Sequence, residues 1–556
     1  MGLLAILLAL TPMAAPPTDL LLEGGRVYVS AGSAPRAVSI LVRDGKILFV
    51  GEPAVARGRA QSPERVDLAG AFVFPGWADA HGHLAGLGKS LEIADLKGAV
   101  SVEEAARRLA ATAASLPPGA WVEGRGWDQN LWPGKAFPDA RVLDEVLPGR
   151  AVVARRVDGH AVWLSSAALQ AAGISAATPD PSGGRILRRP DGSPSGVLVD
   201  NAMDVLDRVL PPATAADLER RFLAATRACA AAGLTQVQDA SGHTGEEIAV
   251  LERLAAAKQL PIRVYATISS EQPVVSSFFF RGVRVGRGSD LLTVRAIKAV
   301  SDGALGSRGA ALLADYSDEP GRQGLLVTPP ERLSELATQA RRQGWQLWIH
   351  AIGDKGNRVS LDAFSHAARA AAKAAPGGER PRIEHAQVVA PEDIPRFGRE
   401  GVIASIQPTH ATSDMPWAEA RVGPQRAAGA YAWRRLVRTG ARLAGGSDFP
   451  VESERPLLGF FAAITRQDRD GQPPGGWRPA EKLTRREALA LFTSDAAYAA
   501  FEEDRRGKIA PGFQADLTVL AEDPMTAPER RISEIPVVLT VVDGKIVHRR
   551  QGAARP

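Results

Sequence analysis

The feature that most constrains the fold is a regular alternation of helix-like and strand-like segments between residues 331 and 448. Alternation of this kind predicts βα units around a parallel sheet. Eight such units close a TIM (β/α)8 barrel, which carries its reactive groups at the C-terminal ends of the strands. The helix-like and strand-like partners are 331–344 with 345–350, 362–375 with 381–385, 391–401 with 402–407, and 428–440 with 441–448.

Short strands and Asp-Gly turns mark both ends of the chain. Asp44-Gly45 and Asp543-Gly544 each lie between two short apolar runs. This arrangement is a strong hairpin signal, but isolated hairpins are only marginally stable. We therefore expect the two ends to form one composite β-sandwich domain from residues 17–75 and 507–556, with residues 76–506 forming the barrel.

One interval is too long for a bare barrel. About 215 residues separate His83 from Lys298, whereas the βα units between them need roughly a hundred. An insertion after the first barrel strand is therefore expected at about residues 89–203. We expect a lid or substrate-shaping subdomain over the barrel mouth; a peripheral decoration fits the pattern equally well.

The composition is that of an ordinary globular protein. The chain is 45% hydrophobic and 23% charged, with a formal net charge of +5. Its 556 residues are enough for a large barrel and an accessory domain. Because the chain has no dense Lys/Arg run, we expect no nucleic-acid partner. The single cysteine, Cys229, excludes an intrachain disulfide and a cysteine metal cluster.

The N-terminal segment resembles a signal peptide. Residues 3–10 are apolar and residues 11–15 are mostly small, which predicts a signal over residues 1–15 and export to the periplasm or the extracellular space. A basic stretch before the apolar run is missing, so a cytoplasmic location is the alternative. No later stretch is long and apolar enough to span a bilayer.

His81 and His83 form the first candidate metal-binding pair. In a strand, side chains at positions i and i+2 share a face, so both imidazoles can bind one metal, and Gly82 leaves room between them. Alone, a His-x-His pair is equally consistent with two structural histidines.

Three further candidate ligands each end a strand candidate. His350 and His385 are one βα unit apart, and Asp448 follows after two further units. Imidazole and carboxylate ligands suit zinc, iron or manganese. Because reactive groups of a barrel gather at the C-terminal strand ends, this spacing predicts a shared metal centre.

Lys298 lies on the same strand face as Val294, Ala296 and Asp302. An ammonium on the interior face of a barrel strand is costly unless it is paired. One interpretation is a structural ion pair with Asp302. The other is addition of CO2 to the neutral amine, giving a carbamate that bridges two cations.

Several ordered motifs resemble the amidohydrolase superfamily, and within it the branch of the N-substituted formamide deformylases (amidohydrolase family 3). The resemblance covers nearly the whole chain and is specific to the branch but not to a substrate. The motifs are Pro75-Gly76-x-x-Asp79-x-His81-x-His83, Gly126-Trp127-Asp128 with Trp132, Asp158-Gly159-His160, Lys298-x-x-x-Asp302-Gly303 with Gly306-Ser307-Arg308, His350-Ala351-Ile352-Gly353-Asp354, Glu384-His385-Ala386, Gly446-Ser447-Asp448 and Gly507-Lys508-Ile509-x-Pro511-Gly512-x-x-Ala515-Asp516.

The resemblance implies two divalent metal ions, of which zinc is the first expectation and iron or manganese the alternatives. The implied ligands are His81, His83 and Asp448 for the more buried metal, His350 and His385 for the second, and a carboxylated Lys298 as the bridge. Two cations about 3.5–4 Å apart can share a water and lower its pKa to about 7. Asp448 would take a proton from this bridging water, which becomes a bridging hydroxide, and would pass that proton to the leaving nitrogen.

Further residues of these motifs are candidates for contacting the substrate or supporting the ligands, with a purely structural role as the alternative for each. They are Trp127, Asp128, His160, Asp302 and Arg308. One departure from the family pattern is Ser165, where relatives commonly carry Asn, so the substrate specificity is expected to differ.

The predicted function is hydrolysis of a non-peptide C–N bond, in an amide, a formamide or a cyclic amide of a small-molecule substrate. Hydrolysis of an N-acyl amino acid, a dipeptide or an ester is the alternative. A non-catalytic metal-binding or regulatory relative is an alternative of another class. The sequence is also compatible with a homo-oligomer.

Overall fold

A computed structural model describes residues 19–156, 161–181, 184–286, 289–306, 308–371, 373–375 and 379–551. The chain divides into two compact units, which are described separately below. Unit 1 comprises Met1–His83 and Thr226–Pro556, and unit 2 comprises Leu84–Ala225. The predicted signal segment, residues 1–15, lies outside the described residues.

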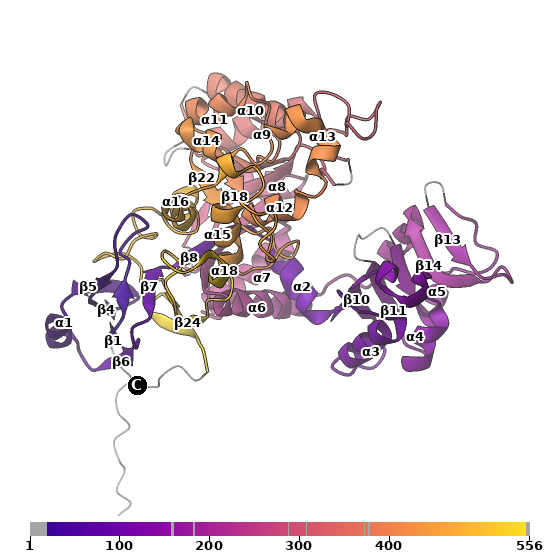
Figure 1. Cartoon of the computed structure of the whole chain (residues 1–556), viewed down its shortest axis with the longest axis horizontal. Coiled ribbons are helices and arrows are strands. Elements are labelled where there is room, and N and C mark those ends of the chain that lie inside the picture. The colour runs from indigo at the N-terminus through magenta and orange to yellow at the C-terminus, as the bar shows by residue number, and fades with distance from the viewer. Residues whose placement is uncertain are drawn as a thin grey trace, which may run out of the picture. The chain divides into compact units, whose positions relative to one another are not determined.

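The centre of unit 1 is a nearly closed parallel sheet of eight strands, which confirms the predicted TIM barrel. Its strands β8, β18 and β22 are labelled in Figure 1. Neighbouring strands pair in the order β22-β21-β20-β19-β18-β16-β15-β8. The strands are β8 (Trp77–Gly82), β15 (Leu234–His243), β16 (Arg263–Ser269), β18 (Leu292–Val300), β19 (Gln346–Ala351), β20 (Arg382–His385), β21 (Ile403–Ile406) and β22 (Leu443–Gly445). A two-residue strand, β17 (Arg284–Val285), pairs antiparallel with β18.

The first and last barrel strands meet through the segment that follows β22. The backbone N–H of Asp448 donates to the carbonyl of His81 at 2.6 Å, and that of His83 donates to the carbonyl of Phe449 at 2.9 Å. Asp79, on β8, accepts from both the backbone and the hydroxyl of Ser447. These bonds complete the ring of strands beside two of the predicted ligands.

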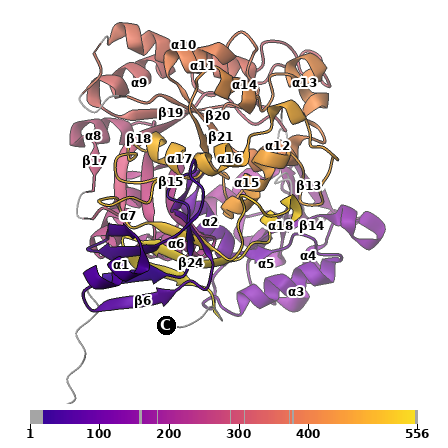
Figure 2. The same cartoon turned by 60° about the vertical axis from the view of Figure 1, so that its left-hand side comes forward.

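Helices cover the outside of the barrel and connect consecutive strands. Figure 2 shows α9, α10, α11 and α14 on the outer side of β19, β20 and β21. The connecting helices are α7 (Gly245–Ala256), α8 (Val274–Arg281), α9 (Pro330–Gln343), α10 (Asp354–Ala370), α11 (Ile394–Glu400), α12 (Pro408–Asp414), α13 (Ala418–Ala427) and α14 (Trp433–Arg438); α15 (Pro456–Thr465), α16 (Arg485–Leu491) and α17 (Ser494–Ala499) follow β22.

Segments from both ends of the chain build the β-sandwich of unit 1. One sheet has the order β5-β4-β1-β6, and the other has the order β25-β24-β23-β7-β2-β3. Apolar residues of both sheets form one buried cluster. The strands are β1 (Asp19–Glu23), β2 (Arg26–Val27), β3 (Arg36–Ala37), β4 (Ser39–Arg43), β5 (Lys46–Gly51), β6 (Pro63–Asp67), β7 (Phe72–Pro75), β23 (Leu517–Leu520), β24 (Val537–Val542) and β25 (Lys545–Arg549).

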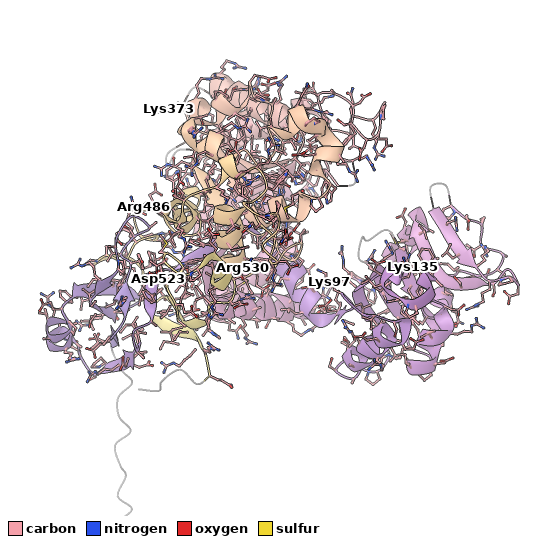
Figure 3. The ribbon with its side chains drawn as sticks, in the orientation of Figure 1. Lys97, Lys135, Lys373, Arg486, Asp523 and Arg530 are labelled. Carbon is pink, nitrogen blue, oxygen red and sulfur yellow. The ribbon has the colours of Figure 1, made fainter. Side chains whose placement is uncertain are left out.

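Both Asp-Gly pairs form tight hairpin turns. Asp44, Gly45, Asp543 and Gly544 all have positive φ, as the favoured two-residue turn requires. A further bond joins the two ends of the chain, because the hydroxyl of Tyr28 donates to Asp523 at 2.8 Å (Asp523 is labelled in Figure 3).

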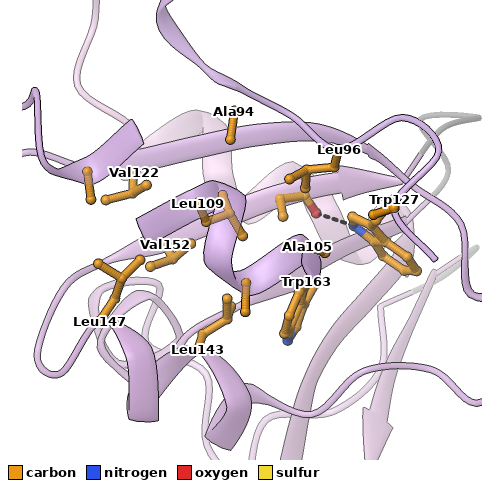
Figure 4. Packing of buried hydrophobic residues seen from close by; sticks show 14 of the residues in the cluster. Ala94, Leu96, Ala105, Leu109, Val122, Trp127, Leu143, Leu147, Val152 and Trp163 are labelled. Carbon is orange, nitrogen blue, oxygen red and sulfur yellow. Dashed lines mark hydrogen bonds between the residues drawn. The ribbon is translucent and has the colours of Figure 1, made fainter. Parts of the chain in front are cut away.

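Unit 2 contains a mixed six-stranded sheet of order β13-β14-β12-β11-β10-β9 with helices packed against it. Its core contains Leu109, Val152, Trp127 and Trp163, all fully buried (Figure 4). The elements are α2 (Leu84–Glu92), β9 (Ala94–Asp95), α3 (Val102–Ala113), β10 (Val122–Trp127), α4 (Ala140–Val146), β11 (Val152–Arg156), β12 (Ala161–Leu164), α5 (Ser166–Ala171), β13 (Gly184–Arg188) and β14 (Pro194–Asp200).

The structural boundaries of the insertion are wider than the 89–203 expected from the sequence. Helix α2 and the first part of α6 (Ala215–Ala231) belong to unit 2. Glu92 of α2 forms ion pairs with Arg220 and Arg221 of α6, and these contacts keep both helices with the insertion. Within the described residues, no helix is both long and apolar enough to cross a membrane.

Candidate metal centre

The candidate centre begins where β8 meets the segment after β22. A methyl group at Gly82 would collide with the ring of Phe449, and one at Gly446 would collide with the backbone of His81. Glycine at these two positions therefore lets the backbones approach closely enough to bring His81, His83 and Asp448 together. His83 Nε2 lies 2.8 Å and His81 Nε2 lies 3.4 Å from the same oxygen, Oδ1 of Asp448.

His350 and His385 extend this cluster from β19 and β20. Their ring centroids are 4.5 Å apart, and the rings of His385 and His81 are 5.0 Å apart. Burial lowers the pKa of His350 to about 3, and it also lowers the pKa of His385. Both imidazoles are therefore neutral at pH 7, which is the form that binds metals.

His410, in the first turn of α12, is a further member of the cluster that the sequence analysis missed. Its ring stacks parallel to that of His385 at 5.9 Å, and its Nε2 lies 3.8 Å from Asp448 Oδ2. The ligand atoms fall into two groups with metal-binding spacing, namely His81, His83 and Asp448, and His385, His410 and Asp448.

Hydrogen bonding around the cluster fits a metal ion. Within this cluster of the described residues, four buried imidazole nitrogens have no hydrogen-bond partner; they are His81 Nε2, His350 Nε2, His385 Nδ1 and His410 Nε2. Buried polar atoms normally have a partner, because desolvating an unpaired one costs free energy. Several imidazoles and a carboxylate are the ligand set that zinc, iron and manganese accept. The residues present therefore suit such a cation.

His81 is held by a carboxylate on its other side. Its Nδ1 contacts Glu384, and Glu384 is in turn held by Arg382 through bonds of 2.6 and 3.1 Å. Burial alone would raise the pKa of Glu384, but Arg382 and His81 lower it well below its usual value. The ionised Glu384 holds a proton on Nδ1, while Nε2 of the same ring faces Asp448.

Two ligand-bearing positions have unusual backbone. His385 has φ 73° and Asp448 has φ 60°, a left-handed conformation that is uncommon for residues other than glycine. Such strain clusters at functional sites. Burial tends to raise the pKa of Asp448, but the neighbouring His81 and His83 lower it far below its usual value.

Lys298 has no ion-pair partner in the described part of the chain, and burial lowers the pKa of its amine. The alternative ion pair with Asp302 is wrong. Asp302 is fully buried and instead accepts the backbone N–H groups of Ala311, Ile352 and Gly353 at 2.7–2.9 Å. Asp302 therefore holds the loop after β18 against the end of β19, and its Oδ1 lies 3.9 Å from Nε2 of His350.

Comparisons with known proteins identify the family of this chain. The model of the Amidohydrolase family matches residues 64–548. The chain belongs to the amidohydrolase family. It is 34% identical over 542 residues to YtcJ of Bacillus subtilis (strain 168), which carries the name of an amidohydrolase, covering 95% of this chain and 99% of that protein.

Two further relatives of this amidohydrolase are informative. The N-substituted formamide deformylase of Arthrobacter pascens is 27% identical over 559 residues, covering 96% of this chain and 99% of that enzyme. A crystal structure of an uncharacterized metal-dependent hydrolase from Pyrococcus horikoshii has a TM-score of 0.76 and 28% identity, covering 92% of this chain and 99% of that chain. Family membership and the histidine cluster together support a hydrolase with a metal site.

The other residues that the sequence suggested for substrate contact or ligand support include Trp127, Asp128 and Arg308. Each of these three bonds to a residue outside the proposed ligand set. Trp127 is fully buried in the core of unit 2, where its Nε1 donates to the carbonyl of Ala154 at 2.8 Å (Figure 4). These contacts are those of a packing residue. Asp128 pairs with Arg156, and Arg308 pairs with Asp318. His160 lies outside the described residues.

Two functional candidates could have been found from the sequence. His410 lies three residues after the end of the expected strand 402–407, so a search just beyond the strand ends would have included it. The sequence places Asp79 two residues before His81 in the first motif, on the same strand face. Its role depends on bonds to Ser447 that exist only in the folded chain, and burial raises its pKa to about 6.

Proposed function

We propose that this amidohydrolase is a metal-dependent enzyme that cleaves a non-peptide C–N bond of a small molecule, in an amide, a formamide or a cyclic amide. The observation that carries the proposal is that ligand atoms of four histidines lie around Asp448 with metal-binding spacing; they are His81, His83, His385 and His410. The name of the Arthrobacter relative, an N-substituted formamide deformylase, favours formamides as the first substrates to test.

The proposed ligands divide between two divalent cations, of which zinc is the first candidate and iron and manganese are the alternatives. They are His81, His83 and Asp448 for one cation, His350 and His385 for the other, and Lys298 between them. When bound, these cations would supply Lewis acidity for the scissile carbonyl and lower the pKa of water to about 7.

Asp448 performs the proton transfers in this proposal. Its Oδ1 lies against His81 and His83, whereas its Oδ2 faces His410. The low pKa of Asp448 keeps the carboxylate ionised, so that it can accept a proton from the attacking water and transfer it to the leaving nitrogen. His410 is placed to hydrogen-bond the substrate beside Oδ2.

Lys298 contributes as a carbamate. Nζ of the neutral amine bonds to the carbon of CO2 as one C–O π bond opens, and it loses one proton to solvent, which leaves a single negative charge shared by two oxygens on the side chain. The burial that lowers the pKa of Lys298 favours the neutral amine that this reaction needs.

The test compares the purified full chain with its Lys298→Ala variant. We expect the parent to hold close to two zinc ions per chain by elemental analysis and to hydrolyse members of a panel of N-substituted formamides, amides and cyclic amides. The variant is expected to lose both metal and turnover, because the two carbamate oxygens that would hold the cations are missing. Short carboxylates added to the variant should restore part of both, since they can occupy the vacated space.

Lys373→Ala is the matched control, because Lys373 is exposed on unit 1 (Figure 3). Metal bound by the parent without turnover of any C–N substrate, or full activity of the Lys298→Ala variant, would contradict the proposal. Turnover of only dipeptides or esters would replace the substrate class and leave the metal centre in place.

A further inference from the structure

A chain of polar groups leads from His83 into the barrel wall along β15. His83 Nδ1 lies 3.3 Å from Ser241 Oγ, and Ser241 Oγ lies 2.5 Å from Asp239 Oδ1. On its other oxygen, Asp239 lies 2.9 Å from His243 Nε2. Asp239 and His243 are fully buried. These groups therefore form a continuous connection that is shielded from solvent beyond Ser241.

The single hydroxyl proton of Ser241 determines which groups donate and which accept along this connection. A hydroxyl has one proton, and the bond to the Asp239 carboxylate uses it. Ser241 Oγ can then only accept from His83, so Nδ1 of His83 carries a proton. In the tautomer whose single ring proton is on Nδ1, the Nε2 lone pair faces Asp448 Oδ1 at 2.8 Å. A lone pair and a carboxylate oxygen at this distance repel each other unless a cation lies between or beside them.

His243 keeps Asp239 ionised. A buried carboxyl would normally become neutral, but the charge of His243 lowers the pKa of Asp239. Asp239 and Glu247 in turn raise the pKa of His243 to about 10, although burial opposes this. Glu247 is anchored in the first turn of α7 by a capping box with Thr244. The pair is therefore an imidazolium and a carboxylate at pH 7.

The connection also lies beside Lys298. A methyl group on Gly242, which has φ 67°, would approach Cβ of Lys298 at 3.4 Å. The segment Ser241–His243 thus touches one proposed ligand through Ser241 and adjoins another through Gly242.

We propose that Ser241, Asp239 and His243 are positioning residues of the metal centre, which fix the tautomer and orientation of His83 so that Nε2 binds the cation. This inference rests on the proposed metal centre and extends it to residues that touch no metal. A hydrogen bond to the second nitrogen of a ligating histidine commonly changes metal affinity by about 10- to 100-fold.

The experiment measures zinc affinity of the full chain by competition with a chelator, and the visible absorption of the cobalt-substituted protein. We expect Ser241→Ala and Asp239→Asn each to weaken zinc binding by about 10- to 100-fold and to alter the cobalt spectrum. Ser241→Thr, which keeps the hydroxyl, should restore most of the affinity. Because the two residues act in series, the double variant should lose little more than the weaker-binding single variant.

Ser360→Ala is the matched control, since the fully buried Ser360 hydroxyl donates to the carbonyl of Gly356 at 2.8 Å and contacts none of the proposed ligands. Urea unfolding of each variant separates loss of affinity from loss of folding. Parent-like affinity and spectrum in folded Ser241→Ala, or fully additive losses in the double variant, would overturn the positioning role. Absence of zinc binding by the parent itself would instead overturn the proposed function, and the inference with it.

Discussion

At the scale of single residues, the candidate centre depends on charges that stabilise one another in the barrel interior. Arg382 holds Glu384, Glu384 holds His81, and the Arg382 guanidinium also lies 3.8 Å from the centroid of the Trp348 ring. Removing one partner of such a buried pair costs several kcal/mol, because the other charge stays buried without compensation. His81 is thus oriented by side chains that lie outside the proposed ligand set.

The buried pair of His243 and Asp239 predicts a pH dependence of stability. The pKa of His243 is about 10 in the folded chain and about 6.5 in the unfolded chain. Its stabilising contribution is therefore fully present below about pH 6.5 and is lost as the pH rises through about 10. We expect a His243→Gln variant to be less stable than the parent at pH 7, with a difference that narrows toward pH 10.

Urea unfolding of both proteins across this pH range, with a chelator in every sample, measures the difference. The comparison with the variant removes the contributions of other groups that titrate at high pH. A stability difference that stays constant from pH 7 to pH 10 would show that His243 is neutral in the folded chain.

At the scale of elements, the ends of two barrel strands could be predicted from the sequence, because a candidate metal ligand, His350 or His385, marks each of them. The strands ending near His350 and His385 were predicted to within one or two residues. Helix α10 begins at Asp354 rather than 362, and α12 and α13 occupy a stretch with no predicted helix. Asp302 could not be assigned, because its partners Ile352 and Gly353 reach it only through the fold.

The close approach of β8 to the segment after β22 predicts that a side chain at Gly446 lowers both the stability of the chain and its zinc affinity. A methyl group there would meet the backbone nitrogen of His81 and the carboxylate of Asp79. Neither can move without breaking the bonds that join the first and last strands. We expect Gly446→Ala to destabilise the chain by about 1–3 kcal/mol and to weaken zinc binding, both measured by urea unfolding with and without zinc.

Gly58→Ala is the matched control, because Gly58 lies within helix α1 (Pro53–Arg59) and its added methyl would meet nothing within 4 Å. That change should stabilise the chain by about 0.5–1 kcal/mol, since alanine favours the helix. A Gly446→Ala protein as stable as the parent, with unchanged zinc affinity, would show that the closure tolerates separation of the strands.

At the scale of the whole molecule, the two units differ in what stabilises them. All the proposed metal ligands belong to unit 1, whereas the described core of unit 2 is apolar and contains Trp127, Trp132 and Trp163. The sequence showed that an insertion exists, from the length between His83 and Lys298. It could not show that α2 and the start of α6 join it, because Glu92 meets Arg220 and Arg221 only in the folded unit.

This division predicts two transitions on heating the full chain in a calorimeter. A ligand that binds the folded state stabilises the unit that holds it, so a chelator should lower the temperature of the transition of unit 1. Leu109→Ala should lower the other transition, because Leu109 is fully buried in the core of unit 2 and its truncation costs about 2–5 kcal/mol. Each change should leave the other transition within error of the parent. If one transition responds to both changes, the two units unfold as a single cooperative body and metal binding stabilises the insertion as well.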